Sequence, residues 1–125
     1  LLYSLQMLYL ILASTVGTAI YKVLKTKTVR PRPYQVHQLI RLGDHPLDYY
    51  SFPSGHTLHA VMATTMLGYA VPVLLILMLP FTVLVAASRM ILGLHYPSDV
   101  AMGAVIGITV AVSFISLAPL LNIVL

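Results

Sequence analysis

The sequence contains no cysteine and few charged residues. The absence of cysteine from the 125 residues excludes disulfide bonds and metal sites built on thiolates. Charged residues make up 8% of the chain, about a third of the share that is usual in soluble domains. Hydrophobic residues make up 59%, and the mean hydropathy is +0.94. This composition indicates a membrane protein.

Charge is absent from both ends of the chain. All seven Lys and Arg, all three Asp and all five His lie between residues 22 and 99, and the stretches 1–21, 57–88 and 100–125 contain no Asp, Glu, Lys or Arg. A membrane-spanning helix needs about 20 mainly apolar residues. The first and third stretches therefore each fit one span, whereas the middle stretch is too long for a single one.

Pro72 divides the middle stretch, because proline has no backbone N–H and disfavours a helical residue before it. Helices are predicted from about Ser54 to Ala70 and from about Val73 to Leu92, which makes four spans in all. Residues 25–53 form a polar loop with five breakers. These breakers are Pro31, Pro33, Gly43, Pro46 and Pro53.

Residues 93–97 join the third and fourth helices, and counting the crossings places this turn and the long loop on the same membrane face. The sequence therefore predicts an all-α integral membrane helical bundle with its charged groups at one end, as a single domain over 1–125. The first residue is Leu, which is typical of a processed, trimmed or partial chain. No signal-peptide pattern is visible near it. Whether further helices precede residue 1 is left open.

The cations at the charged end suit a phosphate. Lys25, Arg32 and Arg89 offer compact ammonium and bidentate guanidinium donors, which match a dianionic phosphate. Ser54 is a candidate N-cap, and Gly55 lets a ligand approach the backbone. The free N–H groups at the helix start that follows attract anions.

Two histidines add reactive groups to this end. Pro97 suits the first turn of the last helix, and Asp99 follows His95 by four residues, within reach of one ring nitrogen. Such a carboxylate fixes the tautomer and leaves the other nitrogen to attack phosphorus. His56 begins the second helix on the same face, where it can protonate the leaving oxygen.

Three segments resemble the signature of the type 2 phosphatidic acid phosphatase (PAP2) superfamily, in order and spacing. They are Lys25, six residues, Arg32-Pro33; then Pro53-Ser54-Gly55-His56; then Ser88-Arg89, five residues, His95, three residues, Asp99.

The resemblance implies hydrolysis of a phosphate ester through a phosphohistidine, without a metal or other cofactor. It makes His95 the nucleophile, Asp99 its orienting partner and His56 the general acid that later activates water. The phosphoryl oxygens are then held by Lys25, Arg32 and Arg89, with hydrogen bonds from Ser54 and Gly55. Membrane members of the family usually have six helices, with the signature in the last four, so this chain corresponds to the core of that fold.

The position of the site at the membrane interface favours a lipid phosphate as substrate, and membrane lipids rather than nucleic acid as partners. Candidates are phosphatidate, phosphatidylglycerophosphate, a polyprenyl pyrophosphate and the phosphate of lipid A, while the oligomeric state is left open. The positive-inside rule would place the Lys/Arg-rich loop in the cytoplasm. The resemblance instead implies an inner or plasma membrane protein whose site faces the periplasm, the exterior or a lumen.

Three alternatives stay open. A lipid phosphotransferase would use the same phosphohistidine and pass the group to a second lipid. A vanadate-dependent haloperoxidase shares the signature, but such relatives are soluble and the hydropathy here opposes it. A non-enzymatic transport or structural membrane protein would place charges within its spans, whereas these lie at helix ends.

Two further features receive a structural interpretation. His59, three residues after His56, is predicted to be a packing or interface group rather than a catalytic one. Gly103 and Gly107 are four residues apart, as in a GxxxG motif for close helix packing.

Overall fold

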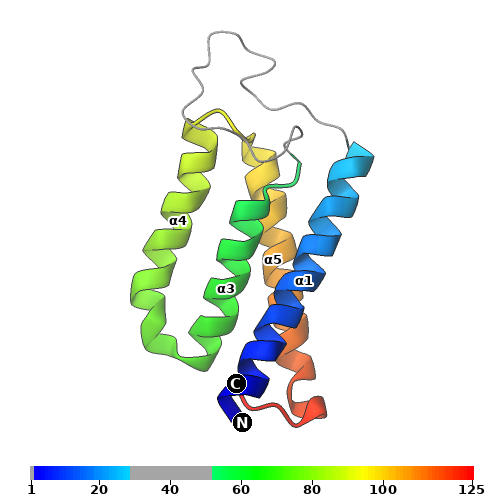
Figure 1. Ribbon diagram of the computed structural model, residues 1–125. Helices are drawn as coiled ribbons and strands as arrows, with labels where there is room; N and C mark the ends of the chain where they lie inside the picture. Colours follow the sequence, from blue (N-terminus) through cyan, green and yellow to red (C-terminus); the bar gives the residue numbers. More distant parts are fainter. Residues whose placement is uncertain (1, 29–51) are drawn as a thin grey trace.

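The structure is a computed structural model that describes residues 2–28 and 52–125. Within these residues the chain forms four α-helices and no strand. They are α1 (Leu2–Thr28), α3 (Gly55–Ala70), α4 (Leu75–Ile91) and α5 (Pro97–Leu117), with 3-10 helices η1 (Pro72–Leu74) and η2 (Pro119–Leu121). The helices lie side by side in a bundle (Figure 1), which confirms the predicted all-α fold.

Helix α3 lies at the centre of the arrangement. It contacts α1, α4 and α5, whereas α1 and α4 make no contact with each other in the described part of the chain. Helices α1 and α4 run toward the upper end in Figure 1, and α3 and α5 run away from it. The end of α1, the start of α3, the end of α4 and the start of α5 therefore meet at one end of the bundle, as the crossing count predicted.

The break between the second and third helices falls at the predicted residues. Helix α3 ends at Ala70, and Val71 has φ −134° and ψ 88°, outside the helical region. Pro72 then begins η1 rather than an α-helix, so α4 starts at Leu75 and not at Val73.

One predicted boundary is wrong, and the last helix ends before the uncharged stretch that indicated it. Helix α1 continues to Thr28, because its last turns contain no breaker before Pro31, and Lys25 therefore lies in a helix and not in the long loop. Helix α5 ends at Leu117, shortly before Pro119, and Asn122 has a left-handed conformation with φ 58°. The last residues thus turn back instead of extending the final span to residue 125.

Among residues 2–28 and 52–125, three segments are long and apolar enough to cross a membrane: Ser4–Lys27, Pro72–Ile91 and Pro97–Leu117. Helix α3 has 16 residues, or about 24 Å, which is shorter than the roughly 30 Å hydrocarbon core. The described residues therefore give three candidate spans and not the predicted four, because the Ser54 cap and Pro72 limit α3 to 16 residues. On the outer helix α4, Ile76, Leu77 and Ile91 are 73–80% exposed, as suits a surface in contact with lipid.

The hydrophobic core lies toward the end of the bundle that holds both termini. It is made of residues from α1, α3 and α5 together with the residue after α5: Tyr9, Ala13, Met62, Met66, Val110, Ala111 and Ala118. The Tyr9 hydroxyl donates a hydrogen bond to the Phe114 carbonyl, and the Gln6 side chain donates one to the Val124 carbonyl. These contacts fix the first half of α1 against α5 and the C-terminal residues (Figure 1).

Helices α3 and α5 pack closely through two glycines. A Cβ atom at Gly103 would lie 2.5 Å from the Ser54 carbonyl oxygen, and one at Gly107 would lie 2.6 Å from that of Leu58. No larger side chain fits at these distances without movement of the backbone. The predicted close packing at this glycine pair is thus confirmed, and it brings the start of α3 against the first turns of α5.

Candidate active site

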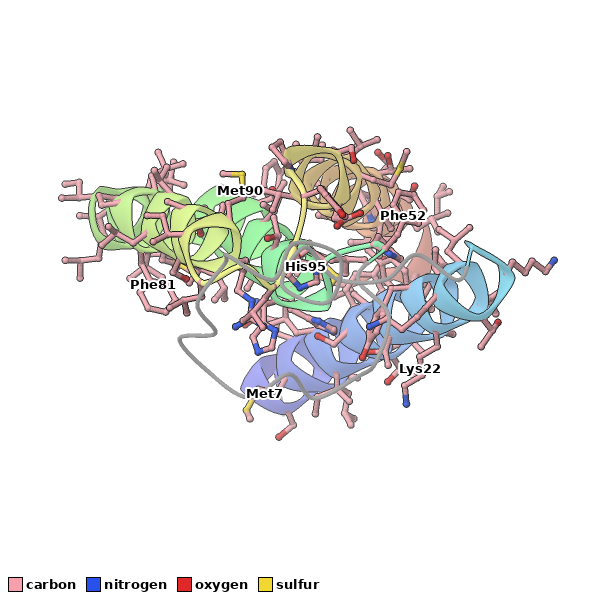
Figure 2. The ribbon with its side chains drawn as sticks, turned by 90° about the horizontal axis from the view of Figure 1, so that it is seen from above. Met7, Lys22, Phe52, Phe81, Met90 and His95 are labelled. Carbon is pink, nitrogen blue, oxygen red and sulfur yellow. The ribbon has the colours of Figure 1, made fainter. Side chains whose placement is uncertain are left out.

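The polar ends of the helices surround a cavity of about 480 Å³, which we call the site cavity. Five of the eight predicted site residues line it: Lys25, Gly55, His56, Arg89 and His95. Ser54 and Asp99 are fully buried, each with 0% exposure. Arg32 lies outside the described residues. Figure 2 views the bundle from this end and shows His95 near the centre of the group of helices.

Ser54 caps the first turn of α3. Its hydroxyl accepts a hydrogen bond from the Thr57 amide at 3.4 Å and donates one to the Thr57 hydroxyl at 2.9 Å. The Ser54 amide donates to the Asp99 carbonyl at 3.1 Å. The predicted N-cap is thus confirmed, and the backbone joins the second segment of the signature to the third.

The turn between α4 and α5 places His95 beside Arg89. The Arg89 carbonyl accepts hydrogen bonds from the amides of both Leu94 and His95, each at 3.1 Å. Gly93, inside this turn, has φ 76°, a left-handed conformation that glycine adopts without the steric cost of a side chain. The turn therefore returns the chain to the site cavity directly after Arg89.

His95 and Asp99 face each other at the start of α5. The His95 Nδ1 atom lies 4.0 Å from the Asp99 Oδ2 atom, and the two side chains are 2% and 0% exposed. This separation is longer than a hydrogen bond. The same Oδ2 atom accepts a hydrogen bond from the Tyr96 amide at 2.7 Å, so Asp99 also caps its own helix.

Two buried cations line the site cavity. Lys25 and Arg89 are each 8% exposed, and each lies in the last turn of its helix, where the helix dipole favours positive charge. A buried charge is costly unless partner groups of opposite charge or hydrogen bonds compensate it. An anionic ligand between Lys25 and Arg89 would be stabilised by both.

Tyr21 connects Lys25 with the start of α3. The Lys25 Nζ atom lies 5.2 Å from the centre of the Tyr21 ring, within the range of a cation–π interaction. A Cβ atom at Gly55 would lie 3.3 Å from the same ring. The absence of a side chain at Gly55 therefore lets α1 approach the first residue of α3.

His59 forms a bridge between α1 and α3. Its Nδ1 atom lies 2.9 Å from the Gly55 carbonyl oxygen, and its Nε2 atom lies 2.9 Å from the Thr18 hydroxyl. The ring also makes an edge contact with Tyr21 at 5.9 Å between centres. The interpretation of His59 as an interface group agrees with this bridge, although the ring also lines the site cavity.

Sequence reasoning did not find the other residues that line the site cavity: Tyr21, Ala60, Phe81 and Val85. Tyr21 lies one helical turn before Lys25, and Ala60 one turn after His56, so helical spacing from the signature residues would have indicated both. Phe81 and Val85 lie on the side of α4, and only the packing of α4 against α3 shows that they line the cavity. They form an apolar wall next to the cationic end.

The described residues contain no group of three or more His, Asp or Glu side chains placed to hold a metal ion.

The comparisons with known proteins identify the family. The PAP2 superfamily profile matches residues 6–122. This chain belongs to the PAP2 superfamily. The predicted membership of the superfamily is thereby confirmed.

Among PAP2 relatives, the decaprenylphosphoryl-5-phosphoribose phosphatase of Mycobacterium tuberculosis is 37% identical over 97 residues. The match covers 76% of this chain and 51% of the relative, and the same values hold for that enzyme in a second strain. This chain therefore spans about half the length of these curated relatives.

Two crystal structures of membrane PAP2 proteins share the fold. LpxE of Aquifex aeolicus has a TM-score of 0.78 and 33% identity, with 86% of this chain and 66% of that one covered. The transmembrane PAP2 type phosphatidylglycerolphosphate phosphatase of Bacillus subtilis has a TM-score of 0.73 and 27% identity, with 90% and 58% covered. The predicted membrane protein of helical PAP2 architecture is thus confirmed.

Proposed function

We propose that this PAP2 chain hydrolyses a phosphate monoester or pyrophosphate on a membrane lipid, through a phosphohistidine and without a metal ion. The observation that carries the proposal is a cavity at one end of a membrane bundle whose described lining contains three histidines, two cations and an apolar wall. We take residues 1–125 as one catalytic domain.

The phosphoryl oxygens bind between Lys25 and Arg89. Both cations are buried at the site cavity, where low polarity strengthens their attraction for an anion. The first amides of α3, near Gly55, point toward the same end and add hydrogen bonds of the kind found at helix N-termini. Ser54 shapes this turn through its cap. Arg32 lies outside the described residues, and we assign it to the phosphate-binding residues because it belongs to the signature.

In the first chemical step, the lone pair of His95 Nε2 attacks phosphorus, and the bond between phosphorus and the lipid oxygen breaks. We assign the attack to Nε2 because Nδ1 faces the Asp99 carboxylate. His56 gives its proton to the departing lipid oxygen. Charge that develops on the equatorial phosphoryl oxygens is stabilised by the fixed cations.

In the second step, His56 takes a proton from water as the water oxygen attacks phosphorus. The bond between phosphorus and Nε2 breaks, and inorganic phosphate leaves the cavity. The net change is the consumption of one water molecule and the formation of a lipid alcohol and phosphate. When the substrate is a pyrophosphate, the leaving group is a lipid monophosphate.

Asp99 orients His95 and favours the charge that develops on its ring during attack. The 4.0 Å separation of Nδ1 and Oδ2 must shorten for a direct hydrogen bond. Such bonds are often long in unliganded proteins and tighten when substrate binds. The Tyr96 amide holds the carboxylate in place meanwhile.

The apolar wall supports a lipid as the carrier of the phosphate. Phe81 and Val85 extend the cavity from the cationic end along the side of α4, and Figure 2 shows Phe81 at the side of the bundle. The names of the Mycobacterium tuberculosis and Bacillus subtilis relatives describe phosphatases of lipid-linked phosphates. We place this site at the periplasmic, exterior or lumenal face, in keeping with the family resemblance.

The test is phosphate release from a panel of lipid phosphates by purified protein in detergent with EDTA present. The parent is expected to release phosphate, and His95→Ala and His56→Ala are expected to lose the activity. Release that requires an added metal ion would contradict the proposed mechanism. Transfer of the phosphoryl group to an added lipid alcohol, without release of phosphate, would identify a phosphotransferase.

A further inference from the structure

We propose that His59 is a positioning residue, which ties α1 to the start of α3 and thereby holds Lys25 at the site cavity. The inference rests on the proposed function, because that function makes Lys25 a ligand of the phosphoryl group. It assigns to His59 a role that acts through Lys25 and involves no contact with the reacting atoms.

The hydrogen bonds of His59 reach both helices. The Gly55 carbonyl can only accept, so the Nδ1 atom at 2.9 Å from it carries a proton. The Thr18 hydroxyl, at 2.9 Å from Nε2, also lies 2.8 Å from the Ser14 carbonyl. The hydroxyl either donates to Nε2, or donates to Ser14 and accepts from a protonated Nε2. The link between the helices is kept in both arrangements.

The contacts of His59 continue along one face of α1 to Lys25. Thr18, Tyr21 and Lys25 follow one another at spacings of three and four residues, which places them on the same face of the helix. The Tyr21 ring forms a T-shaped pair with the His59 ring and lies under the Lys25 ammonium. His59 therefore contacts α1 at two successive turns directly before Lys25.

The position of this link along α1 makes it effective. The cross-helix hydrogen bonds of Gln6 and Tyr9 lie near the opposite end of α1. Tyr9 is about 13 Å along the helix from Thr18, whereas Thr18 is only about 10 Å from Lys25. Loss of the His59 bridge leaves the last turns of α1 held less firmly, so the Lys25 ammonium samples positions away from the phosphoryl group.

The kinetic test is a double-mutant cycle with lipid phosphate as substrate. His59→Leu removes both hydrogen bonds and is expected to lower kcat/KM about tenfold. If His59 acts through Lys25, the same substitution in a Lys25→Met background lowers kcat/KM by less than about twofold. An equal loss in both backgrounds would overturn the proposal, as would an unchanged kcat/KM in the single variant.

Two threonines supply a matched pair of variants. The hydroxyls of Thr15 and Thr18 each lie within hydrogen-bond distance of the carbonyl four residues earlier, but of the two only Thr18 also contacts His59. Thr18→Val is expected to reproduce part of the loss seen in His59→Leu, and Thr15→Val to leave kcat/KM within about twofold of the parent. Equal effects of the two valines would contradict a role for the bridge.

A distance measurement tests the positioning independently of activity. Because the chain has no cysteine, Lys27→Cys on α1 and Ile91→Cys on α4 give one specific pair of spin labels. His59→Leu is expected to broaden the distance distribution between them, and Thr15→Val is not. An unchanged distribution would overturn the positioning role even if the parent is an active phosphatase. A broadened distribution together with a parent that shows no phosphatase activity would support the bridge and contradict the proposed function.

Discussion

The Ser54 carbonyl oxygen occupies the space that a side chain at Gly103 would need, since a Cβ atom at residue 103 would lie 2.5 Å from it. The amide of the same serine bonds to the Asp99 carbonyl. The cap of α3 is therefore fitted against the helix that follows His95. The relative position of His56 and His95 depends on this contact.

Gly103→Ala is expected to destabilise the bundle by about 1–3 kcal/mol, since a backbone carbonyl and not a flexible side chain must move. Displacement of the α3 cap is also expected to lower phosphatase activity. Gly17→Ala is a matched control. A Cβ atom at residue 17 would lie 3.0 Å from the tip of the Leu58 side chain, and this side chain can shift. Thermal unfolding in detergent and phosphate release measure the two effects. A Gly103→Ala protein as stable and active as the parent would contradict the close fit.

Arg89→Met is expected to lower kcat by roughly 10²–10³-fold, because it removes a buried donor that we assign to the phosphoryl oxygens. Arg89→Lys is expected to recover only part of this loss, since an ammonium group cannot make the planar bidentate contact. Lys27, an exposed cation in the last turn of α1, is the control. If Lys27→Met reduces the rate as much as Arg89→Met, general attraction of anions explains the effect and not binding in the cavity.

Asp99→Asn separates the two contacts of this side chain. The amide oxygen can still accept from the Tyr96 amide, so folding stability is expected to change little. Loss of the negative charge next to His95 is expected to reduce kcat by on the order of 10²-fold. Asp99→Ala removes the cap as well and is expected to cost a further ~1 kcal/mol of stability. An active Asp99→Asn enzyme would show that the carboxylate does not assist His95.

Phe81→Ala is expected to discriminate between substrates. Phe81 lines the apolar wall of the site cavity, so its removal is expected to reduce kcat/KM for a long-chain lipid phosphate about tenfold. A short, water-soluble phosphate ester is expected to be affected less than twofold. Leu84→Ala, at an exposed position of α4 outside the cavity, serves as the control. Equal losses for both substrates would argue against a lipid chain at this wall.

The sequence predicted the parts of the fold that depend on local chemistry. Ser54 and Pro97 mark helix starts through capping and a fixed φ, Pro72 ends a helix, and Gly103 permits close packing. Each of these signals lies within a few residues of its effect. The length of α1 was missed because no local signal ends a helix between residue 21 and Pro31.

The environment of Lys25 was less accessible to sequence reasoning. Tyr21 and Thr18 meet His59 only because α1 packs against α3, and nothing in the spacing from residue 21 to residue 59 indicates that pairing. The site cavity likewise takes Phe81 and Val85 from a helix whose rotation is set by its packing on α3. These contacts belong to tertiary structure, whereas the signature residues could be read from order and spacing.

Detection of the phosphoenzyme tests the proposed mechanism most directly. With a labelled lipid pyrophosphate, whose leaving group departs readily, His56→Ala is expected to form the phosphohistidine and to hydrolyse it slowly, since no base activates the water. Rapid quenching is then expected to trap label on His95 through a bond that is stable in alkali and labile in acid. The account predicts this label in His56→Ala and its absence in His95→Ala. Hydrolysis by the parent with no label on His95 in any variant would contradict the phosphohistidine mechanism.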